Sequence, residues 1–267
     1  MKRLSKIAFR KLYKSRVFWI MLLLYAVSMS GMLFGVEAFI NKIASNTGKN
    51  SPIPIPDFSL YEFPYIWHNL SYLAGFLKLF PALILMVFVA ADYSYRTNRM
   101  QMMMGLSRTE YFFTQVLLVL ALAIFSALLL VFWAMAKGLV HSTDLSVSSI
   151  FGKSYFVAAY FLELIAFLSF ALLLVTTLRK SGLSIIAFSI SFIAIEPIIR
   201  VYVPDVVAQN MPFKRIGSMI DVPNTSLMQL FGFNFKTYID LSDLAITLLY
   251  TILFLVLTYW IIKRRDL

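Results

Sequence analysis

Long runs of apolar residues constrain this chain more than any other feature of its sequence. Six runs are near or above the ~20 residues that an α-helix needs to cross a bilayer. Hydrophobic residues make up 60% of the chain and charged residues 14%, whereas soluble domains hold about 45–50% and about 25%. We therefore predict an all-α integral membrane protein with one domain over residues 1–267. Its six transmembrane helices are expected at residues 17–40, 72–91, 111–136, 154–178, 183–203 and 242–262.

The first apolar run also has features of a secretory signal peptide, because a basic start precedes it. The run continues to Phe34 and beyond, which is about the thickness of a bilayer. We interpret it as an uncleaved first span. The fifth run is the least regular of the six, since Glu196, Pro197 and Arg200 interrupt its end.

Lys and Arg are distributed unevenly between the segments that connect the runs. If the N-terminus is cytoplasmic, the inner segments hold 15 of these residues in 44 positions and the outer segments hold 7 in 86. Positive residues are enriched on the cytoplasmic side of membrane proteins. We therefore predict that both termini are cytoplasmic. The predicted outer segments are residues 41–71, 137–153 and 204–241.

Residues 1–16 are too basic to belong to the first span. Leu4, Ile7, Ala8 and Leu12 fall near one face at helical spacing, and basic residues cover most of the remainder. This pattern predicts an amphipathic helix on the inner membrane surface. The alternative is a basic flank that only fixes the orientation of the chain.

The last outer segment is unusually apolar for a loop. Residues 212–220 and 224–231 form two pieces that are too short to span, and each carries several large apolar side chains. We predict two short re-entrant helices, packed against spans five and six as an outer gate, because non-helical backbone enters a bilayer only where protein or water covers it. The alternative is a flexible surface loop with interfacial anchors.

The segment between the second and third runs carries the most specific local signals. Residues 94–104 contain no Gly or Pro, and Gly105 is a helix stop because glycine readily adopts the left-handed conformation. Ser107 and Glu110 have the spacing of a capping box, in which each side chain bonds the other residue's backbone N–H. We expect a short inner helix, a turn and a rigid start to the third span.

These residues also resemble a known family. Tyr95-Arg96-Thr97 with Gln101, then Gly105-Leu106-Ser107-Arg108 before an apolar run, resemble the coupling region of type 2 ABC exporter permeases. The layout of the whole chain is similar to that family as well, although the likeness in sequence covers only residues 92–110. The resemblance assigns contact with an ATPase subunit to Tyr95, Arg96, Thr97, Arg99, Met100, Met103, Gly105, Ser107, Arg108 and Glu110. The alternative is an ordinary basic loop with a well-capped helix.

By this resemblance the chain would be half of a translocation path in a bacterial cytoplasmic membrane. It would pair with a second permease, identical or different, and with a cytoplasmic ATP-binding subunit that holds ATP and Mg. The chain has no G-x-x-x-x-G-K-[ST] motif, so we expect no cofactor on it and no ATP hydrolysis by it. Membrane lipid is an expected partner and nucleic acid is not, because the basic residues lie beside apolar runs.

Four ionisable residues fall inside the predicted spans: Lys78, Glu163, Glu196 and Arg200. Such residues are costly in lipid and should face protein or water. All four lie in the predicted outer half, so we expect a network with a Lys78–Glu163 pair and a Glu196–Arg200 pair one helical turn apart. Three roles stay open for this network: ion pairs that hold the bundle, a gate or substrate contact, and a proton relay.

Other functions are weighed against ATP-driven export. The buried charges suit an ion-coupled secondary transporter, although that class often shows inverted repeats and this chain shows none. An intramembrane enzyme is disfavoured, since there is no catalytic motif, and we expect no metal site with no Cys and two His. A membrane anchor for a complex is a further alternative. The sequence does not identify a substrate.

Orientation is testable because the chain has no native cysteine. Single Lys49→Cys and Asp144→Cys variants should react with a membrane-impermeant thiol reagent in intact cells, since we place both residues outside. Gln101→Cys should react only after the cells are opened. Labelling of the Gln101→Cys variant alone in intact cells would show the opposite orientation.

Overall fold

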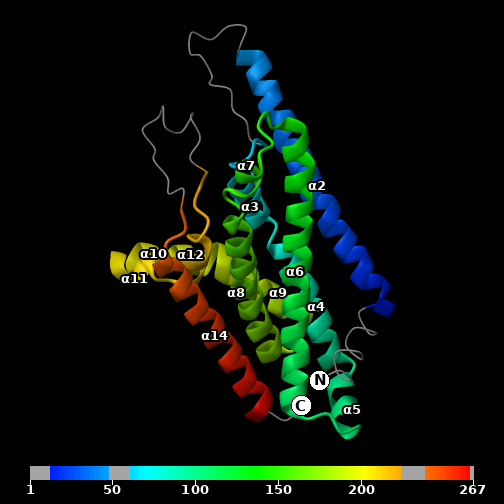
Figure 1. Ribbon diagram of the computed structural model, residues 1–267. Coiled ribbons are helices and arrows are strands. Elements are labelled where there is room, and N and C mark those ends of the chain that lie inside the picture. The colour runs from blue at the N-terminus through cyan, green and yellow to red at the C-terminus, as the bar shows by residue number, and fades with distance from the viewer. Residues whose placement is uncertain (1–12, 48–60, 224–237, 265–267) are drawn as a thin grey trace.

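The computed structural model describes residues 13–47, 61–223 and 238–264, and every regular element in these residues is a helix (Figure 1). Helices α2 to α6 cover the first half of the chain and α7 to α14 the second. The elements are α2 (Arg16–Thr47), α3 (Ile66–Phe76), α4 (Leu79–Ser94), α5 (Thr97–Met103), α6 (Arg108–His141), α7 (Val147–Phe151), α8 (Tyr155–Leu178), α9 (Ser181–Ile190), the π-helix η1 (Ser191–Ile195), α10 (Glu196–Tyr202), α11 (Asp205–Gln209), α12 (Pro212–Gly217) and α14 (Leu241–Arg264).

Five helical segments in the described residues are long and apolar enough to cross a membrane, and α3 with α4 make a sixth candidate if the bent pair counts as one span. These segments correspond to the six predicted runs, so the all-helical prediction is confirmed, and the predicted number of six spans is reached only if the bent pair is one span. The predicted surface helix at residues 1–16 lies almost entirely outside the described residues, and so does the second re-entrant piece at 224–231.

The second candidate span differs from the prediction of one helix over residues 72–91. It begins earlier, at Ile66, and it bends by 46° between α3 and α4. Pro81 explains the break, because it has no N–H to donate to the carbonyl of Leu77 four residues earlier. That carbonyl accepts instead from the N–H of Phe80 at 3.0 Å. Lys78 lies between the end of α3 and the start of α4, at the corner that the two helices form.

The fifth candidate span contains a second irregularity. Its residues run from α9 through η1 into α10, and the N–H of Glu196 donates to the carbonyl of Ser191, five residues back. Pro197 follows directly and removes one more backbone donor. A π-helical turn inside an α-helix is uncommon and often lies at a functional site. The predicted interruption of this span is therefore a change of helical pitch, and the span does not end there.

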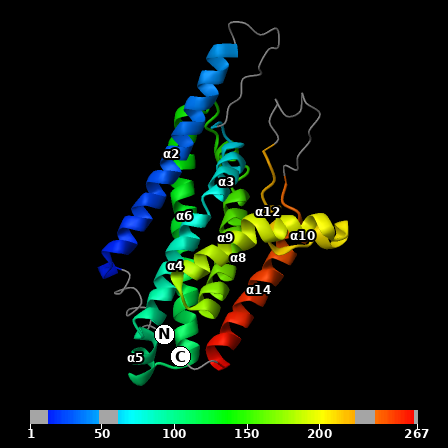
Figure 2. The same cartoon turned by 180° about the vertical axis from the view of Figure 1, so that it is seen from behind.

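Helix α8 is the centre of the bundle. It packs against α14, α6, α4, α3, α9 and α12, and Figures 1 and 2 show these helices around it. Its side chains Leu164, Phe167, Leu168 and Leu172 are fully buried. Helix α2 lies at the periphery, where it packs mainly on α4.

The segments that are predicted to be cytoplasmic lie toward one end of the bundle. The N-terminal end of α2, helix α5, the turn between α8 and α9 and the C-terminal end of α14 all point toward the lower part of Figure 1. This arrangement gathers basic residues from four parts of the chain. They include Arg96, Arg99, Arg179, Lys180 and Lys263.

Gly138 is required where the loop before α3 crosses α6. A Cβ at Gly138 would lie within 3.0 Å of three ring atoms of Phe63, whose ring is buried. We expect Gly138→Ala to lower the free energy of unfolding by about 1–3 kcal/mol, the usual cost of overpacking. Equilibrium unfolding in mixed detergent micelles measures this cost.

Gly35→Ala is the matched control for that experiment. Gly35 also lies within a long helix, but nothing lies within 4 Å of the position of an added Cβ. Alanine is the better helix former, so this substitution should be neutral or stabilising by up to about 1 kcal/mol. Equal destabilisation by both substitutions would show that the Phe63 contact is not the cause.

Candidate functional site

Helix α5 begins at a sharp turn at the basic end of the bundle. Arg96 adopts the left-handed conformation with φ of 53°, which ends α4 and redirects the chain. Thr97 Oγ1 donates to Asp92 Oδ1 at 2.9 Å, and Gln115 Nε2 of α6 donates to Asp92 Oδ2 at 3.3 Å. The prediction of one helix over 94–104 is therefore wrong at its start, because the Asp92 carboxylate stabilises a turn there.

The exit from α5 follows the prediction closely. Gly105 takes a positive φ of 91°. The Glu110 N–H donates to Ser107 Oγ at 3.2 Å and the Ser107 N–H donates to Glu110 Oε2 at 2.9 Å, so the capping box is confirmed. In addition, Arg108 Nη1 donates to the carbonyl of Lys263 in α14 at 2.5 Å. The turn after α5 is thus fixed to both α6 and α14.

The outer face of α5 is exposed and mixes apolar with basic side chains. Tyr95 is 78% exposed and Met103 81% exposed, and Arg96, Arg99 and Met100 are exposed as well. Thr97 and Arg108 are half-buried in the contacts described above. Adaptable methionines beside arginines suit contact with another protein. The residues assigned by resemblance therefore lie on one continuous segment of the chain, and most of them point outward.

The ion pair predicted between Lys78 and Glu163 is confirmed. Lys78 Nζ lies 2.7 Å from Glu163 Oε1, and the two residues are only 8% and 4% exposed. The ammonium also lies 5.0 Å from the ring centre of Phe167 and 5.5 Å from that of Phe192. Lys78 reaches α8 because it occupies the corner between α3 and α4. The break before Pro81 thus positions the Lys78 ammonium next to Glu163.

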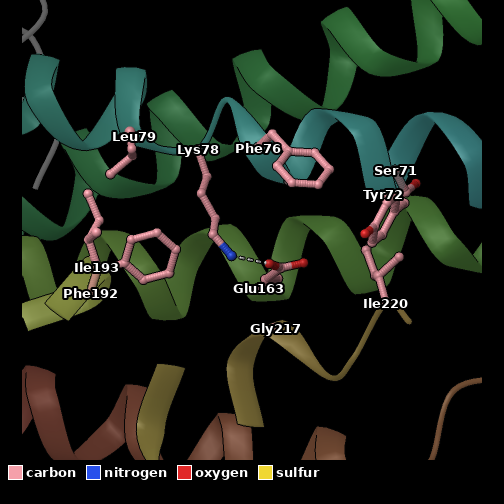
Figure 3. Close-up of a pocket in the computed structure, with 11 residues that line it drawn as sticks. Ser71, Tyr72, Phe76, Lys78, Leu79, Glu163, Phe192, Ile193, Gly217 and Ile220 are labelled. Atoms are coloured by element: carbon pink, nitrogen blue, oxygen red, sulfur yellow. Dashed lines mark hydrogen bonds and ion pairs between the residues drawn. The ribbon is translucent and has the colours of Figure 1, made fainter. Parts of the chain in front are cut away.

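A cavity of about 360 Å³ adjoins this pair (Figure 3). It lies between the corner of the second candidate span, the centre of α8, the π-helical turn of the fifth and the end of α12. Its lining is mainly apolar and aromatic, with a few polar groups. The lining residues are Ser71, Tyr72, Gly75, Phe76, Lys78, Leu79, Glu163, Phe192, Ile193, Gly217 and Ile220.

The predicted Glu196–Arg200 pair is wrong. The Glu196 carboxylate instead accepts from the N–H of Phe213 at 2.8 Å and from the N–H of Lys214 at 2.6 Å. These N–H groups belong to the first turn of α12, where no intrahelical partner exists and the helix dipole favours an anion. Arg200 lies a turn further along α10, and its buried Nε has no hydrogen-bond partner within the described residues.

Helix α12 lies where the first re-entrant piece was predicted over residues 212–220, although it is shorter. Its entry into the bilayer stays a prediction. Phe213 packs among aromatic rings of α8, α9 and η1, with ring centres 5.0 Å from Phe170 and 5.3 Å from Phe192. Ile216 is fully buried against Phe254 of α14. The predicted contacts with spans five and six are present, and α8 of span four is a further neighbour that we did not predict.

Two further ion pairs were missed by the sequence reasoning. Arg215 of α12 pairs with buried Asp243 of α14, and its Nε donates to Asn210 Oδ1 at 3.1 Å. Lys137 of α6 pairs with Glu37 of α2 at 2.5 Å. In the sequence, each pair is marked by an acidic residue near the end of an apolar run, Glu37 and Asp243. No local spacing identifies the basic partner of either residue.

Tyr61 is buried beside the Lys137–Glu37 pair, with its ring centre 5.6 Å from Lys137 Nζ. Its hydroxyl donates to the carbonyl of Leu33 at 2.7 Å, and burial raises the pKa of Tyr61 to about 12.

In the described parts of the chain, no cluster of three or more His, Cys, Asp or Glu side chains is able to hold a metal ion. A scan against protein-family models finds no match to this chain, and a search of curated proteins finds no significant match either.

The carboxylate of Glu196 should control the stability of α12. We expect Glu196→Ala to raise the hydrogen-exchange rates of the Phe213 and Lys214 amides by about tenfold or more, because each loses its acceptor. Glu196→Gln keeps one carbonyl acceptor, so its exchange rates should lie between those of the unaltered chain and those of Glu196→Ala. Mass spectrometry of deuterium uptake over residues 212–217 measures the effect.

Asp205→Ala is the control for this experiment. Asp205 is an exposed carboxylate in the neighbouring α11 and makes no contact with α12 in the described hydrogen bonds. Its loss should leave exchange over residues 212–217 unchanged. If Glu196→Ala also leaves it unchanged, the Glu196 carboxylate does not hold α12.

Proposed function

We propose that this chain is the membrane-spanning permease subunit of an ATP-driven exporter in a bacterial cytoplasmic membrane. In this proposal it crosses the membrane six times and pairs with a second permease copy. Separate cytoplasmic ATP-binding subunits supply the energy. The observation that carries the proposal is α5: a short helix, exposed outward, fixed at both ends and located at the basic end of the bundle.

The membrane topology rests on length, hydropathy and charge. The candidate spans are long enough to cross a bilayer, and helices satisfy most of their backbone groups internally, as hydrocarbon requires. The basic segments gather at the end of the bundle that carries α5 (Figure 1). That end is the cytoplasmic one by the positive-inside rule, so α5 faces the compartment that holds ATP.

Helix α5 is built to pass a force into the membrane. Asp92 ties its start to Thr97 and to Gln115 of α6. The capping box and the Arg108 contact fix its end to α6 and α14. A partner that pushes on the exposed face of α5 would therefore move α4, α6 and α14 together, and would not only deform a loop.

The Lys78–Glu163 cavity and α12 lie further along the path of such a movement. The end of α12 at Gly217 and the segment after it at Ile220 cover one side of the cavity. The first turn of α12 is held by Glu196 and its last turn by Arg215 and Asp243. In the proposed exporter, α12 acts as the outer gate, and these polar contacts hold it closed.

An ion-coupled secondary transporter is the second candidate. The buried Lys78–Glu163 pair beside a cavity favours it, because such pairs often accompany coupled ion or proton movement. The two candidates differ in what drives transport. Purification of the intact chain with a bound ATP-binding subunit favours the exporter, whereas transport by the chain alone along an ion gradient favours the alternative.

Charge and polarity changes on α5 test the exporter. We expect Arg96→Glu with Met103→Asp to weaken binding of the ATP-binding subunit by about 2 kcal/mol or more, the scale of interface hot spots, or to uncouple ATP hydrolysis from transport. Both side chains are exposed, so the bundle should stay folded. Co-purification, ATPase activity and elution volume in detergent give the three readouts.

Lys180→Glu is the control for the charge reversal at Arg96. Lys180 is exposed in the turn between α8 and α9, at the same end of the bundle but outside α5. This variant should retain both the complex and its coupled ATPase activity. If the α5 double variant also retains both, α5 is not the coupling element.

A further inference from the structure

The ion pair in the cavity has bonding capacity that the described chain does not use. An ammonium group has three donors and a carboxylate has two acceptor oxygens. In the described structure, Lys78 Nζ donates one hydrogen bond, to Glu163 Oε1, and Glu163 Oε2 receives none. A buried ion pair is stable only if its remaining donors and acceptors are satisfied. The cavity beside the pair is where further partners would lie.

Ser71 gives a second, independent sign of an absent partner. It is fully buried and lines the same cavity, and its Oγ has no hydrogen-bond partner among the described residues. Other buried serines of the candidate spans satisfy themselves locally: Ser126 donates to the carbonyl of Leu122 and Ser169 to that of Ile165. Buried polar groups without a partner call for an explanation. Figure 3 shows Ser71 on the same side of the ion pair as Tyr72 and the free end of the Glu163 carboxylate.

The rim of the cavity is apolar and opens at the side of the bundle. Phe76 is 59% exposed and Ile193 63% exposed, and both belong to candidate spans. A volume of about 360 Å³ is at the lower end of the ~300–1,000 Å³ of small-molecule sites. The cavity therefore has room for a polar head group, while an attached hydrocarbon chain would lie outside against Phe76 and Ile193.

From these observations we propose that the cavity binds the zwitterionic head of an amphiphile, of the phosphoethanolamine type, that enters sideways from the bilayer. The anionic group of the head binds the free N–H groups of Lys78. The cationic group binds Glu163 Oε2, and the hydroxyls of Ser71 and Tyr72, which lie on the same side of the ion pair, accept from it. This inference rests on the proposed membrane-spanning permease, and it names the class of substrate that such a permease would take.

The charges of the site select a zwitterion over a singly charged head. Lys78 and Glu163 together carry no net charge and lie side by side in a site of low dielectric. An anionic head drawn to Lys78 also meets the Glu163 carboxylate, and a cationic head drawn to Glu163 also meets the ammonium. A zwitterion aligned against the pair meets an opposite charge at both ends. In a dry site that difference is large.

Photolabelling of the full chain in lipid nanodiscs tests the site. The probe is lysophosphatidylethanolamine with a diazirine in its acyl chain, and mass spectrometry of the digest locates the label. We expect labelling in the peptides that contain Phe76 and Ile193. Unlabelled lysophosphatidylethanolamine should compete about tenfold better than lysophosphatidylglycerol or an alkylammonium of the same chain length, a difference of about 1.4 kcal/mol.

Two variants and one control make this experiment decisive. Lys78→Met with Glu163→Gln removes both charges at nearly constant volume, and it should reduce labelling by about tenfold. Gly75→Leu fills the cavity beside the ion pair and keeps both charged residues, since the nearest heavy atom to an added Cβ is Glu163 Oε1 at 4.0 Å. It should reduce labelling similarly. The control, Lys137→Met with Glu37→Gln, removes a different ion pair outside the cavity and should label like the unaltered chain.

The outcomes separate this site from the proposed energy source. Equal labelling of the unaltered chain and both cavity variants means that water alone fills the cavity, and the inference fails. Equal competition by the three amphiphiles refutes the zwitterion. No ATP-binding subunit is needed, so loss of coupling through α5 would leave a positive labelling result standing.

Discussion

Backbone hydrogen bonding in an apolar environment is the constraint on which the rest of this structure depends. A helix within hydrocarbon satisfies its own backbone groups, and proline is the residue that prevents it from doing so. Two of the candidate spans contain such a proline, Pro81 and Pro197, and both spans depart from regular α-helix just before it. Residues at both departures line the cavity, together with Glu163 of α8. The site is therefore a consequence of where the helices are interrupted.

Each interruption also brings an ionisable side chain to an element that is distant in sequence. Lys78 reaches Glu163 from the corner of α3 and α4, and Glu196 reaches the first turn of α12 from the end of the π-helix. Removal of one partner of such a buried pair costs about 3–5 kcal/mol, because the other charge is left without compensation. These contacts therefore fix the relative positions of α3, α8, α10 and α12 more firmly than apolar packing alone.

The sequence predicts those parts of the structure that depend on local pattern. The number and position of the candidate spans follow from the length of the apolar runs, and the capping box follows from the spacing of Ser107 and Glu110. The sequence does not predict pairings that depend on tertiary contact, such as Glu196 with the N-terminus of α12 seventeen residues later. It also hides the early start of α3, because the polar His68 and Asn69 lower the apparent hydropathy although both are buried. The turn at Arg96 is unforeseen because a residue other than glycine seldom takes the left-handed conformation.

The position of α4 connects the two parts of the molecule that the proposals concern. It is a helix of 16 residues, or ~24 Å at 1.5 Å per residue, with the turn into α5 at one end and the corner at Lys78 at the other. In the proposed exporter, α4 would carry a displacement of α5 toward Lys78, since Pro81 and the break lie only at its far end. There α4 meets the bend to α3, so in this proposal the movement would shift Lys78 relative to Glu163 on the central α8. In the proposed exporter, a push at the cytoplasmic face thus reaches the ion pair directly, and the head group bound to that pair is the first thing that it disturbs.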